Sequence, residues 1–163
     1  MKKATFAAGC FWGVEEKFRH VEGVNNTRVG YTGGHVDLST VKQPYKLVCT
    51  DTTGHAEAVE LTYDPEVINY EELVDIFFKL HDPTQKNRQG WDIGKQYRSA
   101  IFYHDEEQKR IANEKKDALN EKKRFKKVVT EIVGASTFYP AEEYHQQYYE
   151  KRGTAGCLTH IKL

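Results

Sequence analysis

The sequence predicts an α+β fold, a ferredoxin-like α/β sandwich with additional loops, in one domain that spans residues 1–163. Its length of 163 residues suits a single domain that buries a core without disulfides. Segments with strand and helix periodicity alternate along the chain, but two strands follow each other with no helix of core length between them. No internal repeat, low-complexity stretch or second domain interrupts this pattern.

The chain begins with a short strand at residues 3–8, which leads directly into an amphipathic helix at residues 11–20. Phe18 follows Val14 by four residues and so lies on the same helix face. A second strand at residues 24–31 ends at a Thr-Gly-Gly turn. The sequence therefore places Cys10 at a corner between a strand and a helix.

A long connection follows at residues 33–55, with at most a brief helix at residues 45–49, and such connections are usually functional. Residues 56–63 then alternate as a strand. Glu57 shares one face of this strand with three bulky residues, Val59, Leu61 and Tyr63. Glu57 is either a buried carboxyl group or, because it lies at the strand's end, a side chain that reaches solvent.

The second half of the chain alternates helices and strands. Asn69, with Glu72 three residues later, forms a capping-box-like start to a helix at residues 70–81. A polar loop at residues 82–96 precedes a strand, and Asp105 caps a charged helix with a solvated outer face. The remaining expected elements are strands at 97–103 and 128–134, helices at 105–123 and from Pro140 to Tyr149, and a flexible tail at 152–163.

The composition excludes several classes of protein. Lys and Arg number 24, as do Asp and Glu, so no net charge attracts nucleic acid or an anionic membrane, and a small neutral ligand or a peptide is the expected partner. No apolar run is long enough for a transmembrane helix. Six residues separate Lys3 from Cys10, fewer than the ~7 to 15 of a signal-peptide core. We therefore expect a cytoplasmic, monomeric protein with an intact N-terminus.

The chain has three widely spaced cysteines, Cys10, Cys49 and Cys157. An odd number at these spacings argues against a secreted disulfide framework and against a metal cluster. The sequence contains no Cys-x-x-Cys, no pair of histidines at metal-ligand spacing and no glycine-rich dinucleotide motif. We therefore expect no metal, flavin or nicotinamide cofactor.

The stretch Gly9-Cys10-Phe11-Trp12-Gly13 is the strongest candidate site. A helix N-terminus favours the thiolate, lowering a thiol pKa below its usual value of roughly 8.5, and the thiolate is the nucleophile. Cysteine, phenylalanine and tryptophan also occur in ordinary cores, so Cys10 is alternatively a buried structural residue. Redox chemistry, a cysteine hydrolase with a histidine base and a non-catalytic ligand-binding domain all remain open at this point. The candidate bases are His35, His55, His81 and His145.

These motifs together resemble the peptide methionine sulfoxide reductase A family. Residues 9–13 are similar to its active-site signature, and the resemblance covers nearly the whole chain. The sequence departs from the family at Trp91, which is bulky for the position before Asp92. The other matching blocks, in order, are Tyr31-Thr32-Gly33-Gly34, Gly54-His55-Ala56-Glu57, Tyr63-Asp64-Pro65, His81-Asp82-Pro83-Thr84, Asn87-Arg88-Gln89-Gly90, Gln96-Tyr97-Arg98-Ser99 and Tyr144-His145-Gln146-Gln147-Tyr148.

The resemblance implies an oxidoreductase that repairs oxidised proteins by reducing methionine S-sulfoxide, free or in proteins. Cys10 would be the nucleophile that attacks the sulfoxide sulfur, and Glu57 the acid that protonates the oxygen. A carboxyl group can do this at neutral pH only if burial raises its pKa. The substrate-binding residues implied by the resemblance are Phe11 and Trp12 around the methyl group, Tyr45 and Tyr97 as hydrogen-bond donors, and Asp92 in the same pocket.

The resemblance also implies how the enzyme recycles. The sulfenic acid left on Cys10 would condense with Cys157, the resolving cysteine of the tail, and thioredoxin would reduce the resulting disulfide. Residues 153–156 span at most about 13 to 14 Å, so the last helix must end near Cys10. We expect Cys49 to be a small buried residue beside the loop that carries Tyr45.

Overall fold

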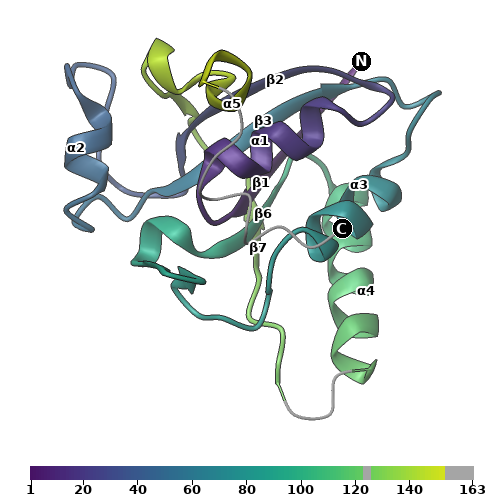
Figure 1. Ribbon diagram of the computed structural model, residues 1–163. Helices are drawn as coiled ribbons and strands as arrows, with labels where there is room; N and C mark the ends of the chain where they lie inside the picture. Colours follow the sequence, from purple (N-terminus) through teal and green to yellow (C-terminus); the bar gives the residue numbers. More distant parts are fainter. Residues whose placement is uncertain (123–125, 153–163) are drawn as a thin grey trace.

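A mixed six-stranded sheet forms the centre of the computed structural model, which describes residues 1–122 and 126–152 (Figure 1). Its strand order is β7-β6-β1-β3-β2-β8, and a separate hairpin pairs β4 with β5. The strands are β1 (Lys2–Ala8), β2 (Val24–Thr32), β3 (Ala56–Tyr63), β4 (Arg88–Gln89), β5 (Asp92–Ile93), β6 (Ser99–Tyr103), β7 (Glu131–Gly134) and β8 (Tyr139–Pro140).

The helices connect these strands and cover the sheet (Figure 1). Helix α1 packs on β1, β2 and β3, while α3 contacts β1 and α4, and α4 reaches β6 and β7. The helices are α1 (Phe11–Arg19), α2 (Pro44–Val48), α3 (Tyr70–Lys79), α4 (Glu106–Lys122) and α5 (Tyr148–Arg152), with short 3₁₀ turns η1 (Lys95–Tyr97) and η2 (Glu143–His145).

The middle of the sheet confirms the predicted fold class. Strands β6, β1, β3 and β2 are neighbours in that order and run antiparallel to each other. With α1 and α3 as the crossovers, this is the β-α-β-β-α-β arrangement of a ferredoxin-like fold. The additions are α2, which lies between β2 and β3, and the edge strands β7 and β8, of which β7 is parallel to β6.

The core lies between the sheet and helices α1 and α3. Phe6 of β1 is fully buried, and its ring stacks on Phe18 of α1 at 5.3 Å and on Phe77 of α3 at 5.2 Å. Such pairs add to the free energy gained by removing large apolar side chains from water. The packing fixes α1 on the sheet, and it thereby fixes the corner at Cys10 where α1 begins.

Two predicted segments differ from the structure. Residues 82–96 were expected to be a loop, but they contain the β4–β5 hairpin and the start of η1. The helix expected from Pro140 to Tyr149 is wrong: Pro140 lies in the edge strand β8, and a helix begins only at Tyr148. An edge strand tolerates proline because the missing N–H leaves no inner ladder partner unsatisfied.

Tertiary hydrogen bonds explain the lost helix. The side-chain amide of Gln146 accepts from the Val29 N–H and donates to the Val29 carbonyl, each at 2.9 Å. Gln147 has φ +46°, which interrupts an α-helix. The segment thus follows the edge of β2 because bonds to the sheet replace those within a helix. The predicted tail at residues 152–163 lies, after Arg152, outside the described residues, and so does Cys157.

Among residues 1–122 and 126–152, no helix has the length and apolar character needed to cross a bilayer.

Candidate active site

Cys10 lies at the corner between β1 and α1, as the sequence predicts. It is the N-cap residue of α1, and its side chain makes no capping hydrogen bond, so the sulfur is not committed to the helix backbone. Gly9 makes the turn with φ +96°, and a Cβ atom on Gly9 would lie 2.9 Å from the side chain of Gln89. Glycine is therefore required at position 9 for two reasons: the backbone has a positive φ, and a side chain would collide with Gln89. The partly exposed thiol sits at the positive end of a nine-residue helix.

Glu57 is buried beside this corner, with only 2% of its surface exposed. Its Oε1 accepts the backbone N–H of Phe11 at 3.2 Å, and its Oε2 accepts Nε2 of Gln96 at 3.1 Å. The alternative in which Glu57 reaches solvent from the end of its strand is therefore wrong. The carboxyl group is instead held in one orientation by these two bonds, one of which is to Phe11, the residue that follows Cys10.

Two tyrosines surround the carboxyl group of Glu57. Burial raises the pKa of Tyr45 far above its usual range, and the charge of Glu57 raises it further. Burial likewise raises the pKa of Tyr97, and the charges of Glu57 and Asp92 add to this effect. Both phenols therefore keep their protons at any physiological pH. Tyr45 and Tyr97 are thus two neutral O–H donors within electrostatic range of the buried carboxyl group of Glu57, and Asp92 acts on Tyr97.

Phe11 and Trp12, the first residues of α1, are packed differently. Phe11 is buried, and its ring tilts against that of Tyr31 at 5.7 Å. Trp12 is only partly buried, and its indole stacks flat on Tyr148 of α5, with the ring centres 3.8 Å apart. The Trp12 Nε1–H donates to Nδ1 of His145 at 2.9 Å. Tyr148 thus fixes the indole from one face, and His145 fixes it from the edge that carries Nε1.

His145 is the buried residue that holds Trp12 in place, with 1% of its surface exposed. Burial lowers the pKa of His145, although the nearby charge of Glu142 opposes the shift. Because Nδ1 accepts the indole N–H, the neutral ring carries its proton on Nε2. That Nε2 has no hydrogen-bond partner among the described residues, and the rings of Tyr45 and Tyr144 pack at 4.6 and 4.2 Å.

Three of the four candidate bases, His55, His81 and His145, form hydrogen bonds that hold the fold together. His145 accepts from Trp12, as described, while His55 bonds to the Val36 carbonyl at 2.7 Å. His81 bonds to the Phe77 carbonyl and to the Ser99 hydroxyl, each at 2.7 Å. These bonds give each of the three rings a structural role in the fold.

The sequence did not reveal several residues that organise the site. Gln96 donates to Glu57 and also to Sγ of Cys49, the latter at 3.5 Å. Glu142 accepts the Tyr31 hydroxyl at 3.1 Å and the backbone N–H of Tyr45 at 3.3 Å, which anchors the start of α2. Each of these polar residues belongs to or borders a matching sequence block, but its partner is distant in sequence. Only the fold shows the role.

The expectation for Cys49 is wrong. Cys49 is exposed rather than buried, because it is the C-cap residue of the short helix α2, which projects away from the sheet (Figure 1). Its thiol lies close enough to Tyr45 for a side-chain hydrogen bond that contributes to the raised pKa of that phenol. Cys49 is therefore a solvent-accessible thiol at the margin of the site.

Metal ligation has no structural support in the described part of the chain. Within residues 1–122 and 126–152, no three side chains of His, Cys, Asp or Glu are grouped so that they could hold a metal ion.

Comparisons with known proteins show which family this chain resembles. The family model described as peptide methionine sulfoxide reductase matches residues 2–163. The chain is 60% identical over 154 residues to the peptide methionine sulfoxide reductase MsrA of Methanosarcina acetivorans, covering 94% of this chain and 80% of that protein.

Two solved structures are also similar. Reduced Mxr1 from Saccharomyces cerevisiae has a TM-score of 0.90 at 38% identity, covering 99% of this chain and 91% of that one. Mxr1 in complex with Trx2 has a TM-score of 0.63 at 30% identity, covering 90% of this chain and 84% of that one.

Proposed function

The chain belongs to the peptide methionine sulfoxide reductase family, and from this premise we propose that Cys10 and Glu57 carry out the reduction of methionine S-sulfoxide to methionine. One observation supports these roles above the others. The buried carboxyl group of Glu57 bonds to the N–H of Phe11, the residue next to Cys10, so an acid and a thiol share one pocket. The match over residues 2–163 also supports a single domain.

In the proposed first step, the Cys10 thiolate attacks the electrophilic sulfur of the sulfoxide. The sulfoxide oxygen must take up a proton before its bond to sulfur breaks, and Glu57 supplies that proton. Tyr45 and Tyr97 donate hydrogen bonds to the oxygen as negative charge develops on it. The attack forms a bond between the Cys10 and methionine sulfurs, and this bond breaks as the protonated oxygen passes to the Cys10 sulfur. Sulfoxide and thiol thus give methionine and a Cys10 sulfenic acid, so the methionine sulfur is reduced and the cysteine sulfur is oxidised.

The aromatic residues at the start of α1 explain how the methyl group of the substrate is recognised. Trp12 is fixed by Tyr148 and His145, so its indole face is preformed rather than assembled by the ligand. Phe11 lies behind it as part of the core. We infer that the substrate's methyl group packs on this wall, which orients the sulfur lone pair and oxygen for one epimer.

Recycling requires a second thiol and a reductant. The sulfenic acid on Cys10 condenses with the Cys157 thiol, water leaves, and a Cys10–Cys157 disulfide forms. A dithiol of the thioredoxin class then reduces this disulfide, and the complex of the similar Mxr1 with Trx2 supports that partner. Helix α5 starts beside Trp12 and ends at Arg152, five residues before Cys157 in the sequence. A monomeric state and a cytoplasmic location stay predictions.

An assay with separated epimers tests the proposed function. The protein should reduce methionine S-sulfoxide with dithiothreitol as the reductant, and it should not reduce the R epimer. Turnover should continue when thioredoxin replaces dithiothreitol. Activity on neither epimer would overturn the assignment, and cleavage of an ester or amide substrate instead would restore the cysteine hydrolase.

Cys157→Ser should uncouple the two halves of the cycle. The variant should release one methionine per protein in a single turnover, because Cys10 is intact, but it should not recycle with thioredoxin. Quantifying methionine in the first turnover and NADPH consumption with thioredoxin and its reductase measures both effects. Cys49→Ser is the matched control and should recycle normally. Thioredoxin-driven turnover in Cys157→Ser would show that Cys49 resolves the sulfenic acid or that thioredoxin attacks it directly.

A further inference from the structure

The β4–β5 hairpin is fixed directly beside the nucleophile. Gln89 of β4 accepts the Asp82 N–H at 2.9 Å and donates to the Asp82 carbonyl at 2.8 Å. The same side chain packs so closely on Gly9 that no Cβ atom would fit there. The base of the hairpin is therefore held against the residue that precedes Cys10.

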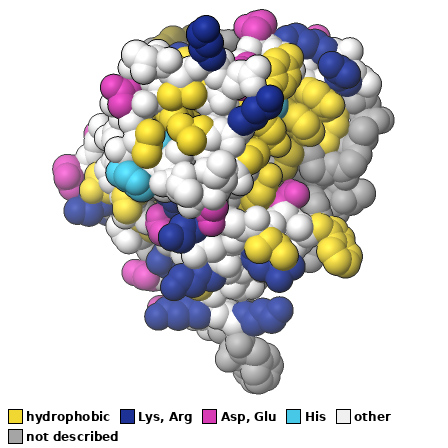
Figure 2. All heavy atoms as spheres, turned by 90° about the vertical axis from the view of Figure 1, so that its left-hand side faces the viewer, with side chains coloured by type: hydrophobic (Ala, Val, Ile, Leu, Met, Phe, Trp, Pro, Cys, Tyr) yellow, Lys and Arg dark blue, Asp and Glu magenta, His cyan; other side chains and the backbone are white. Residues whose placement is uncertain are grey.

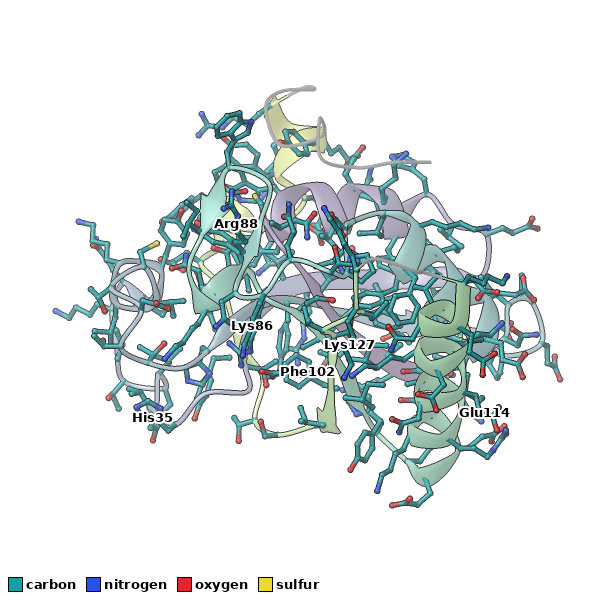
Figure 3. The ribbon with its side chains drawn as sticks, turned by 90° about the horizontal axis from the view of Figure 1, so that it is seen from below. His35, Lys86, Arg88, Phe102, Glu114 and Lys127 are labelled. Carbon is teal, nitrogen blue, oxygen red and sulfur yellow. The ribbon has the colours of Figure 1, made fainter. Side chains whose placement is uncertain are left out.

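The two faces of the hairpin have different surroundings. Gln89 pairs with Asp92, and Arg88 pairs with Ile93, so each pair lies on one face. The face with Gln89 is turned inward, and the charge of Asp92 acts on Tyr97 in the pocket. The other face is exposed, and Figure 3 shows Arg88 there, on the side of the molecule opposite Glu114 of α4.

Gly90 and Trp91 connect the two strands, and hydrogen bonds hold this turn in one conformation. The Gly90 N–H donates to the side chain of Gln85 at 2.7 Å, and the Gly90 carbonyl accepts from Arg88 at 2.6 Å. The Gly94 N–H donates to the Asn87 carbonyl at 2.9 Å, which closes the hairpin below the turn. Trp91 therefore stands on a preformed support.

Trp91 is 89% exposed, although tryptophan is highly buried on average. Burying such a ring releases more free energy than burying most other side chains, so a preformed support that keeps it in water favours contact with a ligand. It is adjacent in sequence to Asp92, which reaches the pocket. Figure 2 shows the side of the molecule that carries α2, where hydrophobic side chains gather in a broad patch rather than being scattered singly.

We propose that Trp91 binds an apolar side chain adjacent to the oxidised methionine in a polypeptide substrate, and so makes the enzyme prefer such peptides over free methionine sulfoxide. This inference rests on the proposed function. The proposed chemistry acts on the methionine side chain, so the backbone of a polypeptide substrate passes beside Cys10, where the hairpin lies against Gly9. A flat, rigid ring gives contact area at small entropic cost and tolerates different apolar partners.

Trp91→Asn tests the inference, because asparagine suits a hairpin turn and removes the ring. Three substrates are compared with dithiothreitol as reductant: a peptide with leucine on both sides of methionine S-sulfoxide, the same peptide with glycine neighbours, and free methionine S-sulfoxide. We expect kcat/KM for the leucine peptide to fall ~5- to 20-fold, mainly through KM. The other two substrates should change by less than twofold.

Two further variants make the result specific to the ring. Trp91→Phe should restore most of the activity on the leucine peptide, because an apolar ring remains. Ile93→Thr is the matched control: Ile93 is 70% exposed on the outer face of the same hairpin, and its loss should leave all three substrates unaffected.

Other outcomes would overturn the inference. Equal loss on all three substrates would show that Trp91 supports the fold of the site, and unchanged kinetics on the leucine peptide would show no contact. A loss of activity seen with thioredoxin as the reductant, but not with dithiothreitol, would show that Trp91 contacts thioredoxin rather than the substrate. An unsubstituted protein that is inactive on all three substrates would instead refute the proposed function itself.

Discussion

Cys10→Ser is expected to abolish the reduction of methionine S-sulfoxide. A serine hydroxyl is not deprotonated near neutral pH and cannot form a sulfenic acid, so neither oxygen transfer nor disulfide formation can occur. The measurement is a single-turnover assay of methionine release at high protein concentration, which detects the first step without recycling. The fold should remain intact, because Cys10 is the N-cap residue of α1 and serine is favoured at that position.

The control for this variant is Cys49→Ser, which removes another accessible thiol and should release one methionine per protein as the parent does. Trapping the sulfenic acid with a dimedone-type reagent should label Cys10 in Cys157→Ser, where no disulfide with Cys157 can form, and adding Cys10→Ser to that variant should remove the label. Appreciable methionine release by Cys10→Ser would sink the assignment of the nucleophile.

Glu57→Gln should slow the chemical step by ~10² to 10⁴, which corresponds to about 2.7 to 5.4 kcal/mol of activation free energy. Glutamine keeps an oxygen that can accept the Phe11 N–H, so the corner at Cys10 should keep its shape. It cannot release a proton, so the leaving oxygen loses its acid while the Tyr45 and Tyr97 hydroxyls remain. The rate constant of methionine release in a single turnover measures the effect.

Glu60→Gln is the matched control for Glu57→Gln. Glu60 lies three residues along the same strand, is also nearly buried, and bonds to Arg28 at 2.8 Å rather than to any residue of the pocket. Its substitution should change the denaturant midpoint more than the rate of methionine release. If Glu57→Gln stays within a few-fold of the parent, the proton comes from another donor.

The elements predicted best from sequence are those whose local pattern and tertiary environment agree. Strand β3 has the predicted bounds, Ala56–Tyr63, and the shared parity of Glu57 with bulky residues correctly indicated an unusual carboxyl group. That parity could not establish burial, because both faces of β3 are covered and a central strand lacks a solvent side. Only the packing of α1 on β3 shows that Glu57 is buried beside Cys10.

The wrong prediction of the last helix and the missed site residues share a cause, which is bonding between residues far apart in the sequence. The last helix was predicted from Pro140, a good first-turn residue, but the Gln146 side chain replaces helical hydrogen bonds with bonds to Val29. His145 and Gln96 have side chains typical of any surface or loop, and their partners lie 133 and 39 residues away. No local pattern encodes a contact of that separation, so the support of the site emerges only in three dimensions.

The contact between Trp12 and His145 has a consequence for the order in which the protein is made. The ribosome releases the chain from its N-terminus, so Cys10 is available long before the segment that carries His145 and Tyr148. Until that segment docks on α1, the indole of Trp12 lacks both its stacking partner and its hydrogen-bond acceptor. A nascent chain thus exposes the Cys10 thiol before the Trp12 indole is fixed, so the methyl-binding wall that we propose forms only after residues 145–148 have docked on α1.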